Sequence, residues 1–121
     1  MDNALRRFKA EIFQALAHPT RIAIVELLRD GEITAGGLGQ RLGIEQSNAS
    51  QHLGVLRTKW VVVSRKEGNQ VYYSIRSTLL FEVLDSMRAY FEDHLLEATD
   101  LLQSIQSEAP AAPRAEPGGP E

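Results

Sequence analysis

Apolar residues recur with the period of a helix along the first half of the chain. The clearest case is segment 3–17, where they return every three or four positions: Leu5, Phe8, Ile12, Phe13 and Leu16. This spacing predicts an amphipathic helix. A second helix is expected over 20–29, because Pro19 suits a first helical turn and Gly31 suits a helix end.

Two further helices are expected over 34–43 and 46–59. Thr34 can cap the first and Gly43 can end it, although the three glycines between them each weaken a helix by up to ~1 kcal/mol relative to alanine. In the second, small and aliphatic residues share one side: Ala49, Leu53 and Leu56. Hydrogen-bonding side chains fall on or near the other side: Gln46, Ser47, Asn48, Gln51 and His52. One face is therefore expected to pack and the other to stay open.

The pattern then changes to that of strands. The run VVVSRKEGNQVYYSI reads as two strands joined by a turn around Gly68, which predicts a hairpin. Ser77 or Thr78 can cap a long amphipathic helix that extends to about Gln106. The fold class is therefore mainly α with a small β-hairpin, in the order α-α-α-α-β-β-α. Residues 1–107 form one domain, and the Pro/Ala/Gly-rich segment 108–121 is expected to be a disordered tail.

Charge is distributed unevenly along the chain. The net charge is −3, yet residues 57–76 hold five basic residues against Glu67 alone, and residues 82–100 hold six acidic residues against Arg88. A polyanion responds to the local field at its contact surface, so a basic hairpin is compatible with nucleic acid despite the net charge. The acidic face is expected to turn away from it.

Several classes of function are excluded by what the sequence lacks. With no cysteine there is no disulfide framework, thiolate metal site or cysteine nucleophile. No apolar run approaches the ~20 residues that cross a bilayer, so a cytoplasmic protein without membrane contact is expected. Gly36, Gly37 and Gly39 do not form a dinucleotide loop, because Leu42 replaces its third glycine and no strand precedes it. No nucleophile–base pair or cofactor loop stands out, so an enzyme is not expected.

A helix with a polar open face beside a basic hairpin is typical of a winged helix-turn-helix protein. The helix suits the major groove, whose base edges offer donors and acceptors, and the hairpin suits the phosphate backbone. The candidate DNA-binding residues are Gln46, Ser47, Asn48, Ser50, Gln51, His52, Arg57, Arg65, Lys66, Asn69 and Gln70. An adaptor that keeps the fold but binds only protein is the alternative.

Three ordered segments resemble signature segments of the ArsR/SmtB family of bacterial winged-helix repressors. They are AHPTRIAIVELLRDGEIT, LGQRLGIEQSNASQHLGVLR and SRKEGNQVYYSI, and the resemblance covers roughly residues 5–105. It implies a homodimeric repressor that is released from operator DNA by an inducer, often a metal ion. It also implies a dimer interface formed by the first and last helices.

The apolar stripe of the last helix agrees with such an interface, because a helix of this length offers more apolar surface than a small domain can cover. The candidate interface residues are Leu5, Phe8, Ile12, Leu84, Met87, Phe91 and Leu95.

The sequence departs from the family at its metal sites. The positions that carry thiolates in the arsenic sensors are here Thr34, Gly36 and Gly39, and the ligand pairs of the zinc-type sensors fall on Ser77, Leu79, Tyr90 and Asp93. No cofactor is therefore expected at the familiar sites. Three kinds of control stay open: a small organic ligand in the dimer seam, a regulatory protein partner on the acidic helix, or an atypical divalent metal site. The candidate ligands of that site are Asp93, His94 and Glu97. Trp60, where relatives have a small residue, has no explanation in the sequence.

Overall fold

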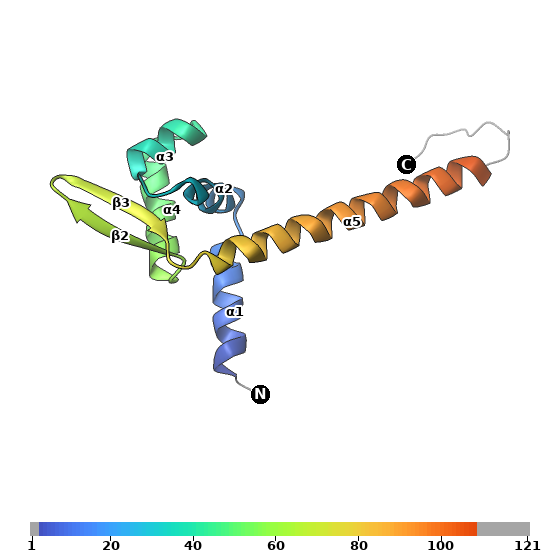
Figure 1. Cartoon of the computed structure of the whole chain (residues 1–121), viewed down its shortest axis with the longest axis horizontal. Helices are drawn as coiled ribbons and strands as arrows, with labels where there is room; N and C mark the ends of the chain where they lie inside the picture. Colours follow the sequence, from blue (N-terminus) through green and yellow to red (C-terminus); the bar gives the residue numbers. More distant parts are fainter. Residues whose placement is uncertain (1–2, 109–121) are drawn as a thin grey trace. The chain divides into compact units, whose positions relative to one another are not determined.

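A computed structural model describes residues 3–108 of the chain. Its elements are α1 (Ala4–Ala15), α2 (Pro19–Leu27), the short 3-10 helix η1 (Leu28–Asp30), β1 (Ile33–Thr34), α3 (Ala35–Leu42), α4 (Gln46–Thr58), β2 (Val62–Glu67), β3 (Gln70–Ile75) and α5 (Leu79–Glu108) (Figure 1). The predicted helices, hairpin and long final helix are confirmed. The chain divides into two compact units, the first ending at Glu82 and the second beginning at Val83 within α5.

The turn between α3 and α4 is fixed by local chemistry. The Thr34 hydroxyl accepts a hydrogen bond of 3.0 Å from the Gly37 amide and so caps α3, as the sequence predicts. Gly43 ends α3 in the left-handed conformation, at φ 71°. A Cβ atom on Gly39 would lie 2.7 Å from the Ile44 carbonyl oxygen, so the close approach of the two helices requires glycine there. The helix-turn-helix geometry therefore follows from a cap and two glycines.

The core of the first unit gathers the apolar sides of α2, α3, α4 and β2. Its largest fully buried side chains are Ile24, Val25, Leu38, Leu53, Leu56 and Val62. Ala49 is also fully buried, so the apolar side of α4 faces the core as predicted. Burying each such leucine contributes roughly 1.5–3 kcal/mol to folding. This packing fixes which side of α4 remains open.

The hairpin is one part of a three-stranded antiparallel sheet of order β1-β3-β2. β2 and β3 pair from Val62 with Ile75 to Glu67 with Gln70, and Gly68 at φ 61° makes the turn. The sequence predicts only the hairpin. The third strand, β1, is two residues long and pairs with Tyr72 and Tyr73, so it joins the β2–β3 hairpin, here called the wing, to the start of α3.

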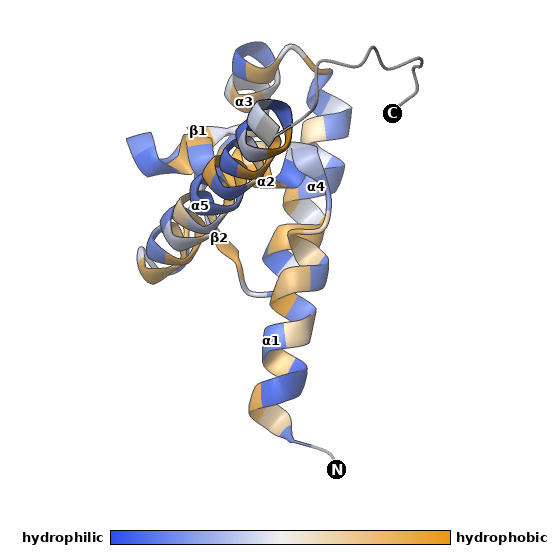
Figure 2. Cartoon of the chain, turned by 90° about the vertical axis from the view of Figure 1, so that its right-hand side faces the viewer, coloured by the Kyte–Doolittle hydropathy of each residue, from blue (hydrophilic) through white to orange (hydrophobic). Residues whose placement is uncertain are grey.

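Helix α5 begins where the Ser77 hydroxyl accepts a hydrogen bond of 3.2 Å from the Leu79 amide, which confirms the predicted start. Apolar and polar residues are interspersed along this helix, as Figure 2 shows by hydropathy. Large apolar side chains of α5 that are exposed in the single chain include Val83, Met87, Tyr90, Phe91, Leu95, Leu96, Leu101, Leu102 and Ile105. Between residues 3 and 108, no helix combines the length and apolar character needed to cross a membrane. Of the predicted tail 108–121, Glu108 is the last residue of α5, so the tail prediction is wrong at that residue, and residues 109–121 lie outside the described residues.

Candidate nucleic-acid interface

The open side of α4 carries the side chains that the sequence singles out. Gln46, Ser47, Asn48, Ser50 and Gln51 are all exposed, while Ala49, Leu53 and Leu56 on the opposite side are buried. The burial of three residues at positions i, i+4 and i+7 fixes the rotation of the helix. Five hydrogen-bonding side chains are therefore presented together on one surface.

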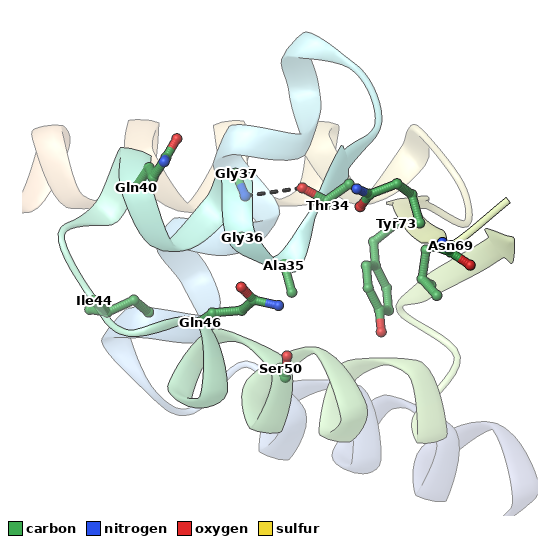
Figure 3. A pocket seen from close by; sticks show the side chains of 12 residues that line it. Thr34, Ala35, Gly36, Gly37, Gln40, Ile44, Gln46, Ser50, Asn69 and Tyr73 are labelled. Carbon is green, nitrogen blue, oxygen red and sulfur yellow. Dashed lines mark hydrogen bonds between the residues drawn. The ribbon is translucent and has the colours of Figure 1, made fainter. Parts of the chain in front are cut away.

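A groove of about 860 Å³ lies beside the start of α4. Figure 3 shows Gln46 and Ser50 of α4 on one side of it, Thr34 and Gly37 on another, and Asn69 and Tyr73 of the wing on a third. None of the residues that line it is charged, and most of the exposed lining is polar. The structure thus brings the wing turn to the first turns of α4. Such a groove can donate and accept hydrogen bonds without a fixed charge.

His52 differs from the other candidates because it is half-buried. Its Nδ1 lies 3.5 Å from Nη1 of Arg21, and its ring centre lies 4.5 Å from that of His18. Burial first, then the nearby His18 and Arg21, lower the pKa of His52 below its ordinary value. Arg21 also donates from Nε to the Ala15 carbonyl oxygen at 2.5 Å. His52 therefore connects α4 to α2 and, through Arg21, to the end of α1.

On the wing, Arg65 is exposed but has acidic neighbours. Its guanidinium donates to both carboxylate oxygens of Glu32, with Nε 3.0 Å from Oε2, and to Oε1 of Glu67 at 2.6 Å. It also lies over the Tyr72 ring, 4.8 Å from its centre. The hydrogen bond from Arg65 lowers the pKa of Glu32, and the two carboxylates raise the pKa of Arg65. Glu32 is a residue that sequence reasoning missed, because its partner is 33 positions away.

The remaining cationic and polar candidates are exposed. Lys66 stands next to Arg65 on β2, Asn69 and Gln70 follow the turn, and Arg57 lies in the last turn of α4. Lys59 is one of the five basic residues of segment 57–76, and its Nζ atom lies 3.4 Å from Oε1 of Glu11 on α1. Two of the five basic residues in segment 57–76, Lys59 and Arg65, are therefore ion-paired.

The candidate interface and metal residues are also mostly exposed. Leu5 is 60% and Phe8 55% exposed on α1, and Ile12 is half-buried. On α5, Leu84 is half-buried, and the exposed members are Met87, Phe91 and Leu95. Asp93, His94 and Glu97 are exposed on the same helix. Among residues 3–108, no three His, Asp or Glu side chains gather as a metal site would require, so a site there would need ligands from a second copy.

Comparison with known proteins agrees with this geometry. Residues 16–58 match a family model described as a helix-turn-helix domain. The chain is 39% identical over 104 residues to the HTH-type transcriptional regulator Rv0081 of Mycobacterium tuberculosis, covering 85% of this chain and 91% of that protein. It is 33% identical over 76 residues to the transcriptional repressor SdpR of Bacillus subtilis, covering 63% of this chain and 84% of SdpR.

Solved structures give the same result. The crystal structure of Rv0081 superimposes with a TM-score of 0.71 at 40% identity, covering 81% of this chain and 99% of that chain. A second structure is the homodimeric winged helix-turn-helix DNA-binding domain of Mb0332 from Mycobacterium bovis, a possible ArsR-family transcriptional regulator. It superimposes with a TM-score of 0.69 at 28% identity and covers 76% of this chain and 85% of that chain.

Proposed function

The chain belongs to the ArsR/SmtB family of winged helix-turn-helix, DNA-binding transcriptional regulators, and we propose that it binds operator DNA as a homodimer and acts as a repressor that a signal releases. The observation that carries the proposal is the open side of α4. Five neutral hydrogen-bonding side chains stand there beside the wing, while the opposite side of the helix is fully buried. Such a regulator acts where bacterial DNA lies, in the cytoplasm.

Each part of this surface has its own role. Gln51 and Asn48 carry amide groups, which can pair with the two major-groove positions of adenine, and Ser47 and Ser50 can reach bases or phosphates. Lys66, Arg57 and the wing-turn residues Asn69 and Gln70 hold the flanking backbone. His52 supports α4 from behind through Arg21. Arg65 contributes to phosphate binding only to the extent that phosphate displaces Glu32 and Glu67.

The homodimer is proposed because of the apolar faces of α1 and α5. Exposed side chains such as Phe8, Phe91 and Leu95 would each contribute roughly 1.5–3 kcal/mol if they were buried against a second copy. A twofold axis would place two α4 helices about 34 Å apart, at successive major-groove turns of a near-palindromic site. Dimerisation and DNA recognition are therefore parts of one proposal.

Several kinds of signal are compatible with this surface. A regulatory protein could bind the acidic face of α5, and an organic ligand could enter the dimer seam. A divalent metal at His94, with Asp93 and Glu97, would need a second chain to complete its coordination. The residues present at the familiar thiolate positions, Thr34, Gly36 and Gly39, do not suit a soft metal.

A mobility-shift assay with DNA from upstream of the protein's own gene tests the proposal. The wild type should bind this DNA more tightly than unrelated DNA. Lys66→Ala should weaken binding to all sequences similarly and reduce the salt slope by about 1, whereas Gln51→Ala should relax preference at one base position by about 1–3 kcal/mol. An unchanged affinity in both variants would contradict the assignment of α4 and the wing. Failure to bind any DNA would favour a protein-binding adaptor.

A further inference from the structure

Trp60 has an unusual backbone conformation for its residue type. It is the only residue other than glycine with positive φ, at 70°, in the described range 3–108. The Trp60 amide donates to the Arg57 carbonyl oxygen at 3.2 Å and the Val61 amide to that of Leu56 at 2.9 Å, which is the Schellman pattern that ends many helices. Glycine usually occupies this position, because a side chain there costs about 1–2 kcal/mol. Trp60 is also 63% exposed, so burial does not offset this strain.

Gly54 is a second residue whose type is unfavourable for its local structure. It lies inside α4, where glycine is about 1 kcal/mol less favourable than alanine. A Cβ atom on Gly54 would meet no atom within 4 Å, so packing inside the chain does not require glycine. Local rules that are broken without a structural reason tend to mark functional sites. Glycine allows another molecule to approach a backbone closely.

These two residues line the same groove. It has a volume of about 640 Å³ and lies between the second half of α4 and β2, and its other lining residues are Arg57, Thr58, Val62, Val63, Ser64 and Arg76. The Arg76 guanidinium lies 4.6 Å from the centre of the Trp60 ring. Two of the lining residues are arginines and none is acidic. The groove therefore combines an exposed aromatic ring, positive charge and an open stretch of helix backbone.

We propose that this groove is an effector site for a small molecule that carries both a flat aromatic ring and a negatively charged group. The ring would stack on Trp60, and a carboxylate or phosphate would pair with Arg57 and Arg76, which offer planar groups suited to such anions. The missing side chain at Gly54 leaves room for the ligand against α4. Aromatic acids and nucleotides share this chemistry.

The position of the groove connects its occupant to DNA binding. One wall is α4, which we call the recognition helix because we propose that it contacts the bases, and the other is β2, the first strand of the wing. A ligand that contacts both walls would stabilise one arrangement of helix and wing relative to others. The affinity for DNA would then change, and the size of the change is limited by how much more tightly the ligand binds one arrangement than another. This regulation rests on the proposed DNA binding, but the DNA binding itself does not require the ligand.

The test uses the single tryptophan of the chain as the probe. The full-length protein is titrated with salicylate and, separately, with AMP, while Trp60 emission is followed. At least one of them should give a saturable change, and matched molecules that lack the charge (salicylamide, adenosine) or the ring (inorganic phosphate) should bind at least about tenfold more weakly. No saturation with either, or equal binding of the matched molecules, would overturn the proposal.

Variants locate the site without relying on DNA binding. Arg76→Ala should weaken the titrated ligand by about tenfold or more through loss of a charge-assisted pair, and Gly54→Leu should fill the groove and block it. Arg88→Ala, which removes an exposed arginine from α5, is the control and should bind as the wild type does. Circular dichroism verifies folding. If the ligand binds but leaves the affinity for DNA unchanged in a mobility-shift assay, the effector role is overturned. The same assay without ligand tests the proposed DNA binding separately.

Discussion

The guanidinium of Arg65 on the wing donates hydrogen bonds to both carboxylate oxygens of Glu32, which precedes β1. The contact joins residues 33 positions apart and lies where β1 pairs with β3. A carboxylate and a DNA phosphate both suit the fork of an arginine side chain. If Arg65 contacts DNA as the sequence predicts, Glu32 would therefore compete with phosphate for its guanidinium.

Replacing Glu32 tests this competition. Glu32→Gln should raise the affinity for DNA of any sequence, because it frees a cation for phosphate, and the salt slope should become steeper by about 0.9. Fluorescence anisotropy at several salt concentrations measures both. Asp30→Asn, which removes the partner of Arg41 instead, is the matched control and should leave the slope unchanged. A Glu32→Gln protein with the wild-type slope would show that Arg65 fastens the wing and does not meet phosphate.

Thermal unfolding tests the strain at Trp60. Trp60→Gly should leave the free energy of unfolding unchanged or raise it by up to about 1 kcal/mol, because glycine adopts positive φ freely. It loses the contact with Arg76, which at an exposed site contributes about 0.5–1 kcal/mol. Trp60→Val should destabilise by about 0.5–1 kcal/mol, since valine keeps the backbone strain and loses the contact with Arg76. If Trp60→Gly destabilised the protein as much as Trp60→Val or more, the left-handed backbone at this position would not be strained.

The environment of His52 predicts that acid destabilises the protein. Since its pKa is lowered in the folded state, the folded protein binds this proton less tightly than the unfolded chain does. The contribution of neutral His52 to the free energy of unfolding is fully present above pH 6.5, the ordinary pKa of histidine, and is lost as the pH falls below that value. Unfolding measured from about pH 8 to about pH 5 should show a smaller loss in His52→Gln than in the wild type. His94→Gln, at an exposed position, is the control, and an equal loss in wild type and His52→Gln would contradict the prediction.

The apolar face of α5 predicts a change in assembly. Phe91→Glu places a charge at a position that is 59% exposed in the single chain and that the proposed dimer buries. Sedimentation at micromolar protein should give a dimer for the wild type and a monomer for the variant, because a buried unpaired charge costs several kcal/mol. Glu92→Gln, the neighbouring polar position, should remain dimeric. A monomeric wild type would remove the basis for paired recognition helices.

Much of this architecture follows from periodicity and local caps. The helices, the Thr34 cap, the Gly43 stop and the Gly68 turn depend on residues a few positions apart, so the sequence predicts them. The two-residue strand β1 could not be predicted, because it is defined by pairing with Tyr72 and Tyr73 far along the chain.

The same limit applies to the site. The open face of α4 is predicted by its spacing, but the partners of Arg65, His52 and Lys59 come from distant segments. Trp60 likewise has no explanation in the sequence, because its left-handed backbone is defined by the Schellman hydrogen bonds at the end of α4.

Footprinting with dimethyl sulfate tests the central claim most directly, because this reagent methylates the N7 atom of guanine in the major groove. On an operator fragment, the wild type should protect guanines in two patches whose centres lie about 10 base pairs apart on one side of the duplex. Gln51→Ala should lose protection within the patches and leave their spacing intact. Protection in a single patch, or none in the major groove while the protein is bound, would contradict the account.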